Sequence, residues 1–193
     1  MQTGIALIVG LGNPGKEHDN TRHNAGFWLI DELASGSGAT FKHESKFNGD
    51  VCKANINGHA CWLLKPDTYM NRSGQAVAAL ATFYKIPSDA MLVVHDEIDL
   101  PPGVARLKQG GGHGGHNGLR DIIACTGKKD FYRLRIGVGH PGTSDAVSGY
   151  VLNKPPGAER DMIDTSIRDA LDVMPEIISG NFQNAMQELH SKN

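Results

Sequence analysis

The sequence lacks several features that would assign it to a common class. No stretch of its 193 residues approaches the roughly 18 to 20 uncharged apolar residues of a membrane-spanning helix, and no basic segment near the first residue leads into an apolar run. Its three cysteines, Cys52, Cys61 and Cys125, include no C-x-x-C pair, which disfavours a disulfide framework and a structural zinc site. We therefore expect a soluble, cytoplasmic protein without membrane contacts.

An overall excess of one charge is also absent, since 19 basic residues oppose 21 acidic ones. The charges are nevertheless distributed unevenly. Residues 103–135 hold seven basic and two acidic side chains, a net +5, whereas residues 157–193 hold three basic and seven acidic ones, a net −4. Either this is an ordinary solvated surface, or the basic segment forms a face that binds phosphate groups.

The predicted elements describe an α/β protein. The length suits one domain over residues 1–193, and the sequence contains no internal repeat or low-complexity linker. Short apolar runs predict strands over residues 5–12, 51–56, 59–65, 91–95, 104–108 and 131–138, with a hairpin turn at Asn57-Gly58. Helical spacing predicts helices from His23 or Asn24, over 73–84, after Asn117, and twice in the tail, broken near Pro175 and Gly180. This order favours a single three-layer α/β/α domain with a twisted mixed β-sheet.

A glycine-rich loop follows the first predicted strand and satisfies two phosphate-binding patterns. As G-x-G-x-x-G it would bind a dinucleotide, but Pro14 removes an amide donor and no second apolar strand ends in an acid about 20 residues later. As G-x-x-x-x-G-K it lacks the Ser or Thr that would hold magnesium, and Glu17 in that place would repel phosphate. The remaining interpretations are a rigid turn that presents the Asn13 amide to a substrate and a turn with only a structural role.

Four further polar groups are predicted at strand ends or helix starts: His23, Asn71, Asp96 and Asn117. A histidine supplies a base with a pKa near 6.5, and a carboxylate on its other nitrogen fixes the tautomer. Side-chain amides can donate to a developing oxyanion. Because the sequence has no G-x-S-x-G elbow and no recognised cysteine signature, this set indicates a hydrolase that uses water directly, although each residue alone could be structural.

A metal cluster is an alternative for His95, Asp96, Glu97, His113 and His116. The H-x-x-H spacing does not place two ligands on one helical face, and the surrounding glycines provide no rigid support for them. We therefore expect no metal. The glycines before Asn117 suit a nest of backbone amides at a helix start that faces phosphate, or a flexible connection.

Six separated motifs, in the same order, resemble those of the bacterial-type peptidyl-tRNA hydrolases. The matching segments are Gly10–Gly15, Thr21–Gly26, Thr68–Gly74, His95–Gly103, Gly110–Arg120 and Arg133–Pro141. The resemblance runs from about Ile5 to the predicted C-terminal helices. Two positions depart from the family: His18 stands where a Tyr is common, and Tyr69 replaces a usual Phe.

This resemblance implies an esterase that cleaves the bond between a peptide and the 3′-terminal ribose of tRNA, as a cytoplasmic monomer that needs no cofactor. It implies that His23 is the general base and Asp96 its orienting partner. Asn13 and Asn71 would hold the peptide backbone and help to stabilise the oxyanion, Met70 would line the cleft, and Asn117 would position water or the 3′ end. The face for the tRNA acceptor stem maps onto Arg106, Lys108 and Arg133. A non-catalytic RNA-binding module and a nucleotide-dependent enzyme are the competing classes.

Overall fold

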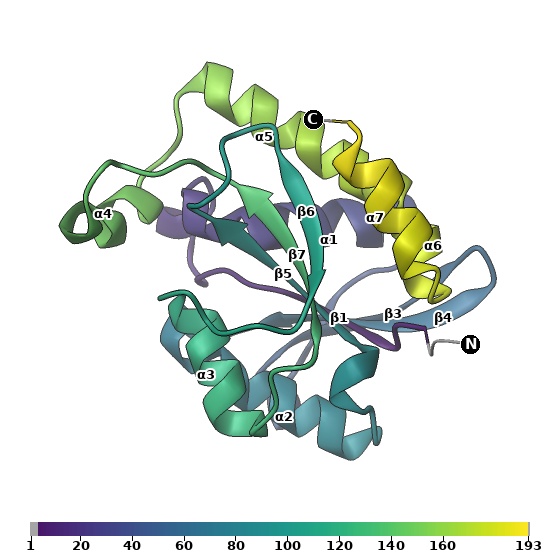
Figure 1. The fold of residues 1–193 in the computed structure, drawn as a ribbon. Helices are drawn as coiled ribbons and strands as arrows, with labels where there is room; N and C mark the ends of the chain where they lie inside the picture. The colour runs from purple at the N-terminus through teal and green to yellow at the C-terminus, as the bar shows by residue number, and fades with distance from the viewer. Residues whose placement is uncertain (1–3, 193) are drawn as a thin grey trace.

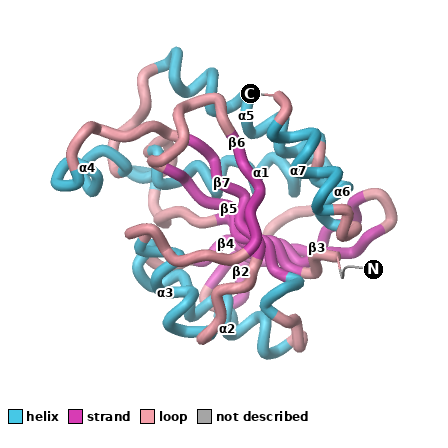
Figure 2. Tube along the Cα trace, viewed as in Figure 1, coloured by secondary structure: helices cyan, strands magenta, loops and turns pink. Residues whose placement is uncertain are grey.

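The computed structural model of the protein describes residues 4–192. A mixed seven-stranded sheet runs through the centre of the molecule (Figures 1 and 2). The strand order is β2-β3-β4-β1-β5-β7-β6. Neighbours from β4 to β7 run parallel, whereas the pairs β2–β3, β3–β4 and β6–β7 are antiparallel. The strands are β1 (Leu7–Gly10), β2 (Lys42–Glu44), β3 (Gly49–Ile56), β4 (His59–Pro66), β5 (Met91–Glu97), β6 (Ala105–Gln109) and β7 (Tyr132–Gly137).

Helices cover both faces of this sheet, which confirms the three-layer α/β/α prediction (Figure 1). One face carries α1 (Ala25–Gly36), α5 (Gly157–Asp172), α6 (Met174–Ile178) and α7 (Phe182–His190), and the other carries α2 (Ser73–Phe83) and α3 (Asn117–Thr126). Along β1, Ile8 packs into the first apolar cluster, while Leu7 and Val9 pack into the second. Burial on both faces explains why the central strands are continuous apolar runs in the sequence.

The C-terminal segment differs from the sequence prediction, because it forms three helices rather than two. Pro175 lies in the first turn of α6, where its missing N–H costs no helical hydrogen bond. Gly180, with φ of 90°, then separates α6 from α7. The short elements β2 and α4 (Val147–Val151) were also not predicted, because three and five residues are too few to carry a clear period.

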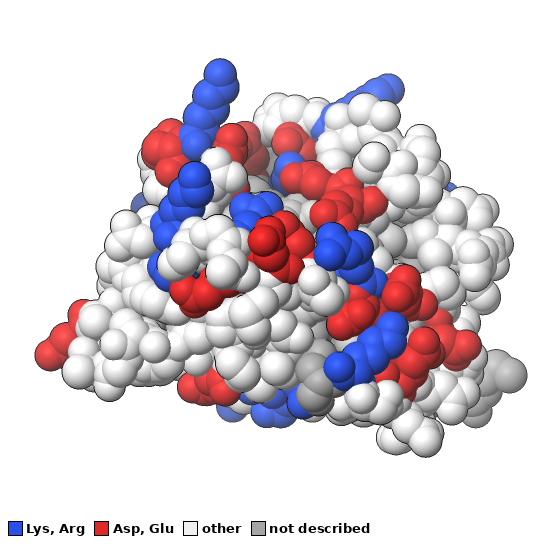
Figure 3. Space-filling view, turned by 90° about the horizontal axis from the view of Figure 1, so that it is seen from above, with Lys and Arg blue, Asp and Glu red and all other residues white. Residues whose placement is uncertain are grey.

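The acidic C-terminal segment does not form a uniform negative field. The face over α5, seen from above in Figure 3, shows acidic side chains interspersed with basic ones. Arg160 pairs with Asp164 at 3.0 Å within α5, and Lys192 lies 3.3 Å from Asp172. No helix in the described part of the chain is long and apolar enough to cross a membrane.

Parallel pairing brings the carboxyl ends of β1 and β5 to one edge of the sheet, with Gly10 opposite Val94. Two glycines let α1 approach these ends closely: a Cβ atom on Gly10 would lie 2.6 Å from the Gly26 carbonyl oxygen, and one on Gly26 would lie 2.4 Å from that of Val94. The first glycine of the G-x-G pattern therefore serves helix packing. The same packing places the 3₁₀ turn η2 (Arg22–Asn24) beside the end of β5.

Candidate active site

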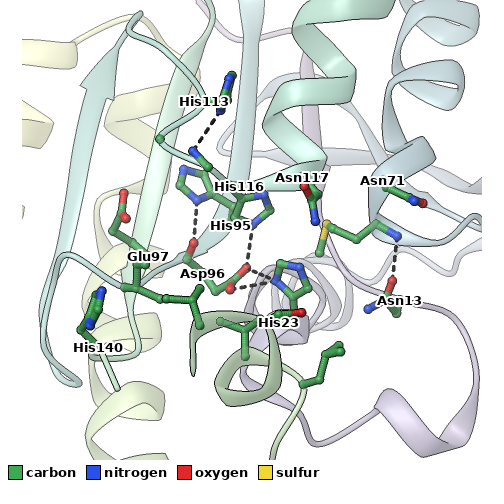
Figure 4. A pocket seen from close by; sticks show the side chains of 18 of the residues that line it. Asn13, His23, Asn71, His95, Asp96, Glu97, His113, His116, Asn117 and His140 are labelled. Carbon is green, nitrogen blue, oxygen red and sulfur yellow. Dashed lines mark hydrogen bonds and ion pairs between the residues drawn. The ribbon is translucent and has the colours of Figure 1, made fainter. Parts of the chain in front are cut away.

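His23 and Asp96 form the centre of the site (Figure 4). Nδ1 of His23, from η2, lies 2.9 Å from both carboxylate oxygens of Asp96 in β5, and the two residues are only 8% and 3% exposed. An ionised carboxylate can only accept, so Nδ1 carries the proton and donates. Nε2 of His23 is therefore the basic atom, because it carries the free lone pair.

The same contacts set the protonation of both groups. Burial lowers the pKa of His23, but the charge of Asp96 and its hydrogen bonds outweigh this effect and raise the pKa above the ordinary 6.5. Burial raises the pKa of Asp96, yet the adjacent His23 and His116 hold it well below its usual range. The carboxylate thus stays ionised beside an imidazole that can take up a proton.

His116 is a third member of this centre, and the sequence suggested it only as a possible metal ligand. Its Nε2 donates to Oδ1 of Asp96 at 2.8 Å, because its Nδ1 accepts the backbone N–H groups of Gly118 and Leu119 at the start of α3. Its ring centroid lies 4.9 Å from that of His23. The available signal was its place just before a predicted helix, where a side chain commonly caps the helix.

One group of side chains among residues 4–192 could hold a metal ion: His23, Asp96 and His116, whose ligand atoms lie within 4.8 Å of one another. Each of these atoms already takes part in a hydrogen bond inside the group. The sequence also suggested His113 and Glu97 as metal ligands, but both interact with other groups. His113 accepts the Gly115 N–H, and Glu97 pairs with Arg135 at 2.9 Å.

His95 precedes Asp96 and is buried behind it. Its Nδ1 donates to the Asp96 carbonyl oxygen at 2.8 Å, and its Nε2 has no hydrogen-bond partner. Burial, followed by the nearby His116, lowers the pKa of His95 to about 4. The ring is therefore neutral at neutral pH, and its hydrogen bond supports the backbone at the carboxyl end of β5.

A cleft of about 560 Å³ opens beside His23 (Figure 4). One wall carries Asn13, Met70 and Asn71, the second comes from the glycine loop and Asn117, and the third from α4. Asn71 and Asn117 are exposed, whereas Met70 is buried. The structure thus brings together, around one cleft, all six residues that the sequence assigned to catalysis and substrate binding.

Hydrogen bonds fix the orientation of Asn13. Its Oδ1 accepts the N–H of Met70 at 2.7 Å, and Asn24 holds its backbone through two further bonds of 2.8 and 3.0 Å. Because Oδ1 is occupied, the Nδ2 amide is the group that Asn13 can offer to a ligand. Asn117 is similar, since its Oδ1 accepts a bond of 2.8 Å from Arg120.

The predicted basic face lies on the edge strand β6 and its neighbour β7. In the register of these two antiparallel strands, Arg106 lies opposite Arg135 and Lys108 lies opposite Arg133. The four cations therefore share one face of the sheet. Lys108 is exposed and Arg106 is half-buried. The edge itself is covered in part by α7, because His190 Nε2 accepts the Leu107 N–H at 3.0 Å.

Arg133 is placed differently from our expectation of a tRNA contact. It is only 3% exposed, and its guanidinium donates to the carbonyl oxygens of Gly111, Gly112 and Lys129. The Gly111 and Gly112 carbonyls belong to the glycine loop, and Arg133 satisfies both of them. Its side chain therefore holds the loop that leads to His116 and Asn117.

The fold and the site together define an α/β enzyme in which a buried histidine–aspartate pair can activate water. A family model described as peptidyl-tRNA hydrolase matches residues 7–193. Proteins named peptidyl-tRNA hydrolase from Neisseria gonorrhoeae and Pseudomonas paraeruginosa are 57% and 58% identical over 192 and 191 residues, which cover 100% and 98% of both chains. The chain belongs to the peptidyl-tRNA hydrolase family.

The fold agrees with this assignment. The crystal structure of peptidyl-tRNA hydrolase from Acinetobacter baumannii superimposes with a TM-score of 0.96 at 50% identity, covering 99% of this chain and 97% of that one.

Proposed function

We propose that this protein hydrolyses the ester bond between a peptide and the 3′ end of tRNA, which recycles tRNA from stalled translation, and that His23 is the general base. One observation carries this proposal: Asp96 holds Nδ1 of His23, so the Nε2 lone pair is available to water in the cleft. No amine or thiol nucleophile is needed, because an ester is already activated toward water.

The reaction follows from the arrangement of these groups. Nε2 of His23 takes a proton from water as the water oxygen attacks the ester carbonyl carbon. The amide groups of Asn13 and Asn71 donate to the oxyanion of the tetrahedral intermediate, and Asp96 stabilises the imidazolium. When the intermediate collapses, the bond to the ribose oxygen breaks and His23 returns its proton to that oxygen. Asn117 positions the water or the 3′ end.

The substrate has an RNA part and a peptide part, and the surroundings of the cleft suit both. Lys108 and Arg106 lie on the strand beside the glycine loop, where they can contact phosphates of the acceptor stem. We assign Arg133 to holding that loop instead. The proposed working state is a cytoplasmic monomer, because translation generates the substrate there and one chain supplies the whole site.

The test is incubation with N-acetylated aminoacyl-tRNA. The control substrate is aminoacyl-tRNA whose amino group is free. The wild-type protein should release tRNA from the acetylated substrate, and His23→Ala should do so at least about 10²-fold more slowly. Binding of tRNA without hydrolysis would make the protein an RNA-binding module. A variant that retains more than half of the wild-type turnover would remove His23 from the mechanism.

A further inference from the structure

Arg22 is a buried cation next to His23 that the proposed mechanism does not use. It is 6% exposed, and its guanidinium carbon lies 3.7 Å from the ring centroid of Tyr150. Its Nη1 donates to the Tyr150 carbonyl oxygen at 2.9 Å, and its backbone N–H donates to that of Asn153 at 3.1 Å. Arg22 therefore joins η2, which carries the base, to the segment that contains α4.

Burial of the Arg22 cation in this contact between η2 and the α4 segment costs free energy. No ion pair within residues 4–192 involves Arg22, and its buried Nε has no hydrogen-bond partner. Burying a cation without a carboxylate costs free energy that a neutral contact would not. A planar guanidinium can, however, stack on a ring and donate to a carbonyl at the same time, so it fixes direction as well as distance.

The segment that Arg22 holds is a wall of the cleft with little other support. Val147, Ser148, Val151 and Leu152 line the cleft, yet Val151 is the one buried residue between positions 142 and 152. On the far side, the Tyr150 hydroxyl donates to the Val138 carbonyl oxygen at 2.7 Å, just beyond β7. Tyr150 is thus clamped between Val138 and Arg22.

The chemistry of this wall indicates which part of the substrate it contacts. It offers apolar side chains, including Leu152, which is 44% exposed, whereas the cations Arg106 and Lys108 are on β6. Apolar side chains suit the acyl part of the ester, and phosphates suit the cations. A shift of α4 relative to η2 would therefore move the acyl group relative to His23.

We propose that Arg22 is a positioning residue, which holds the α4 wall in a fixed place relative to His23 so that the acyl group is bound in line with the base. This inference rests on the proposed hydrolysis of peptidyl-tRNA. It concerns binding of the acyl group and leaves the His23–Asp96 pair as described.

The test compares Arg22→Lys, which keeps the charge but not the planar stack, with Tyr150→Leu and Tyr150→Phe. KM for tRNA that carries a bulky, apolar N-acylated residue should rise about tenfold in Arg22→Lys and Tyr150→Leu, the scale of one lost stacking contact with its hydrogen bond. The increase should be smaller with an N-acetylglycyl ester. Tyr150→Phe keeps the ring and should raise KM less than Tyr150→Leu does.

Two further readouts separate positioning from a general loss of structure. The acid limb of the pH profile should stay in place in Arg22→Lys, because the His23–Asp96 pair is intact. The double variant Arg22→Lys/Tyr150→Leu should be no worse than Tyr150→Leu alone, because that substitution already removes the ring on which Arg22 stacks. If Arg22→Lys does not fold, Tyr150→Leu, which leaves the arginine in place, carries the same test.

Unchanged KM in folded Arg22→Lys, independent effects of the two substitutions, or an equal KM increase for the glycyl ester would overturn the proposal. A shifted acid limb with unchanged KM would also overturn it, because Arg22 would then act on His23 itself. Failure of the wild-type protein to hydrolyse either ester is a different outcome, which would refute the proposed function.

Discussion

Replacing Asp96 with Asn should place the proton of His23 on the wrong nitrogen. The Nδ1 atom of His116 accepts backbone N–H groups, so its Nε2 must donate toward position 96. The oxygen of an introduced Asn amide would therefore face His116, and its NH₂ group would face Nδ1 of His23. His23 would then carry its proton on Nε2, where the lone pair that activates water is required.

The expected loss is about 10²- to 10⁴-fold in kcat, the contribution of a general base, because the wrong tautomer leaves His23 unable to accept the proton of water. The pH dependence should change as well. In the wild type, Asp96 raises the pKa of His23 above 6.5, so kcat/KM should fall as the pH drops through a value above 6.5. Without that charge, burial dominates and lowers the pKa of His23, and the acid limb should move to lower pH.

The assay is a pH profile of kcat/KM on N-acetylated aminoacyl-tRNA, with thermal melting as the control for folding. The double variant Asp96→Asn/His116→Asn is a matched test, because the shorter side chain can still cap α3 but no longer dictates how the amide at position 96 is turned. It should be more active than Asp96→Asn alone. A loss below tenfold, or an acid limb that stays in place, would refute this reasoning.

Three further predictions concern the rest of the site. Asn71→Ala should lower kcat by the equivalent of about 2 to 4 kcal/mol, as expected for an oxyanion donor, with little change in melting temperature because the side chain is exposed; a change in melting temperature alone would make Asn71 a structural residue. Arg106→Ala/Lys108→Ala should flatten the salt dependence of tRNA affinity by roughly one unit per lost phosphate contact, with kcat little changed, whereas Arg133→Ala should lower kcat and leave the salt slope unaltered. Equal slopes for the wild type and the double variant would place the acceptor stem elsewhere. Treatment with a chelator should leave activity unchanged; inactivation that zinc reverses would assign a metal to His23, Asp96 and His116.

Sequence reasoning was most informative where short-range chemistry determines structure. Apolar runs and the Asn57-Gly58 turn predicted the central strands and the hairpin, and the parallel sheet then placed Asn13 and Asp96 at one edge. His116 was considered only as a possible metal ligand, because its hydrogen bond to Asp96 joins residues 20 positions apart that only the fold brings together. The burial of Arg133 was not predicted for a related reason: a sequence shows a cation, but its burial depends on carbonyls of the glycine loop that it binds.

The strand proposed to receive tRNA is also the outer strand of the sheet, and this has a consequence for solubility. An edge strand exposes unpaired backbone groups that can template pairing with another copy of the chain. On β6 this tendency is opposed by the charges of Arg106 and Lys108, and by His190, which occupies the Leu107 N–H. Removing these cations would therefore do more than weaken RNA binding, because it would also lower the barrier against edge-to-edge aggregation.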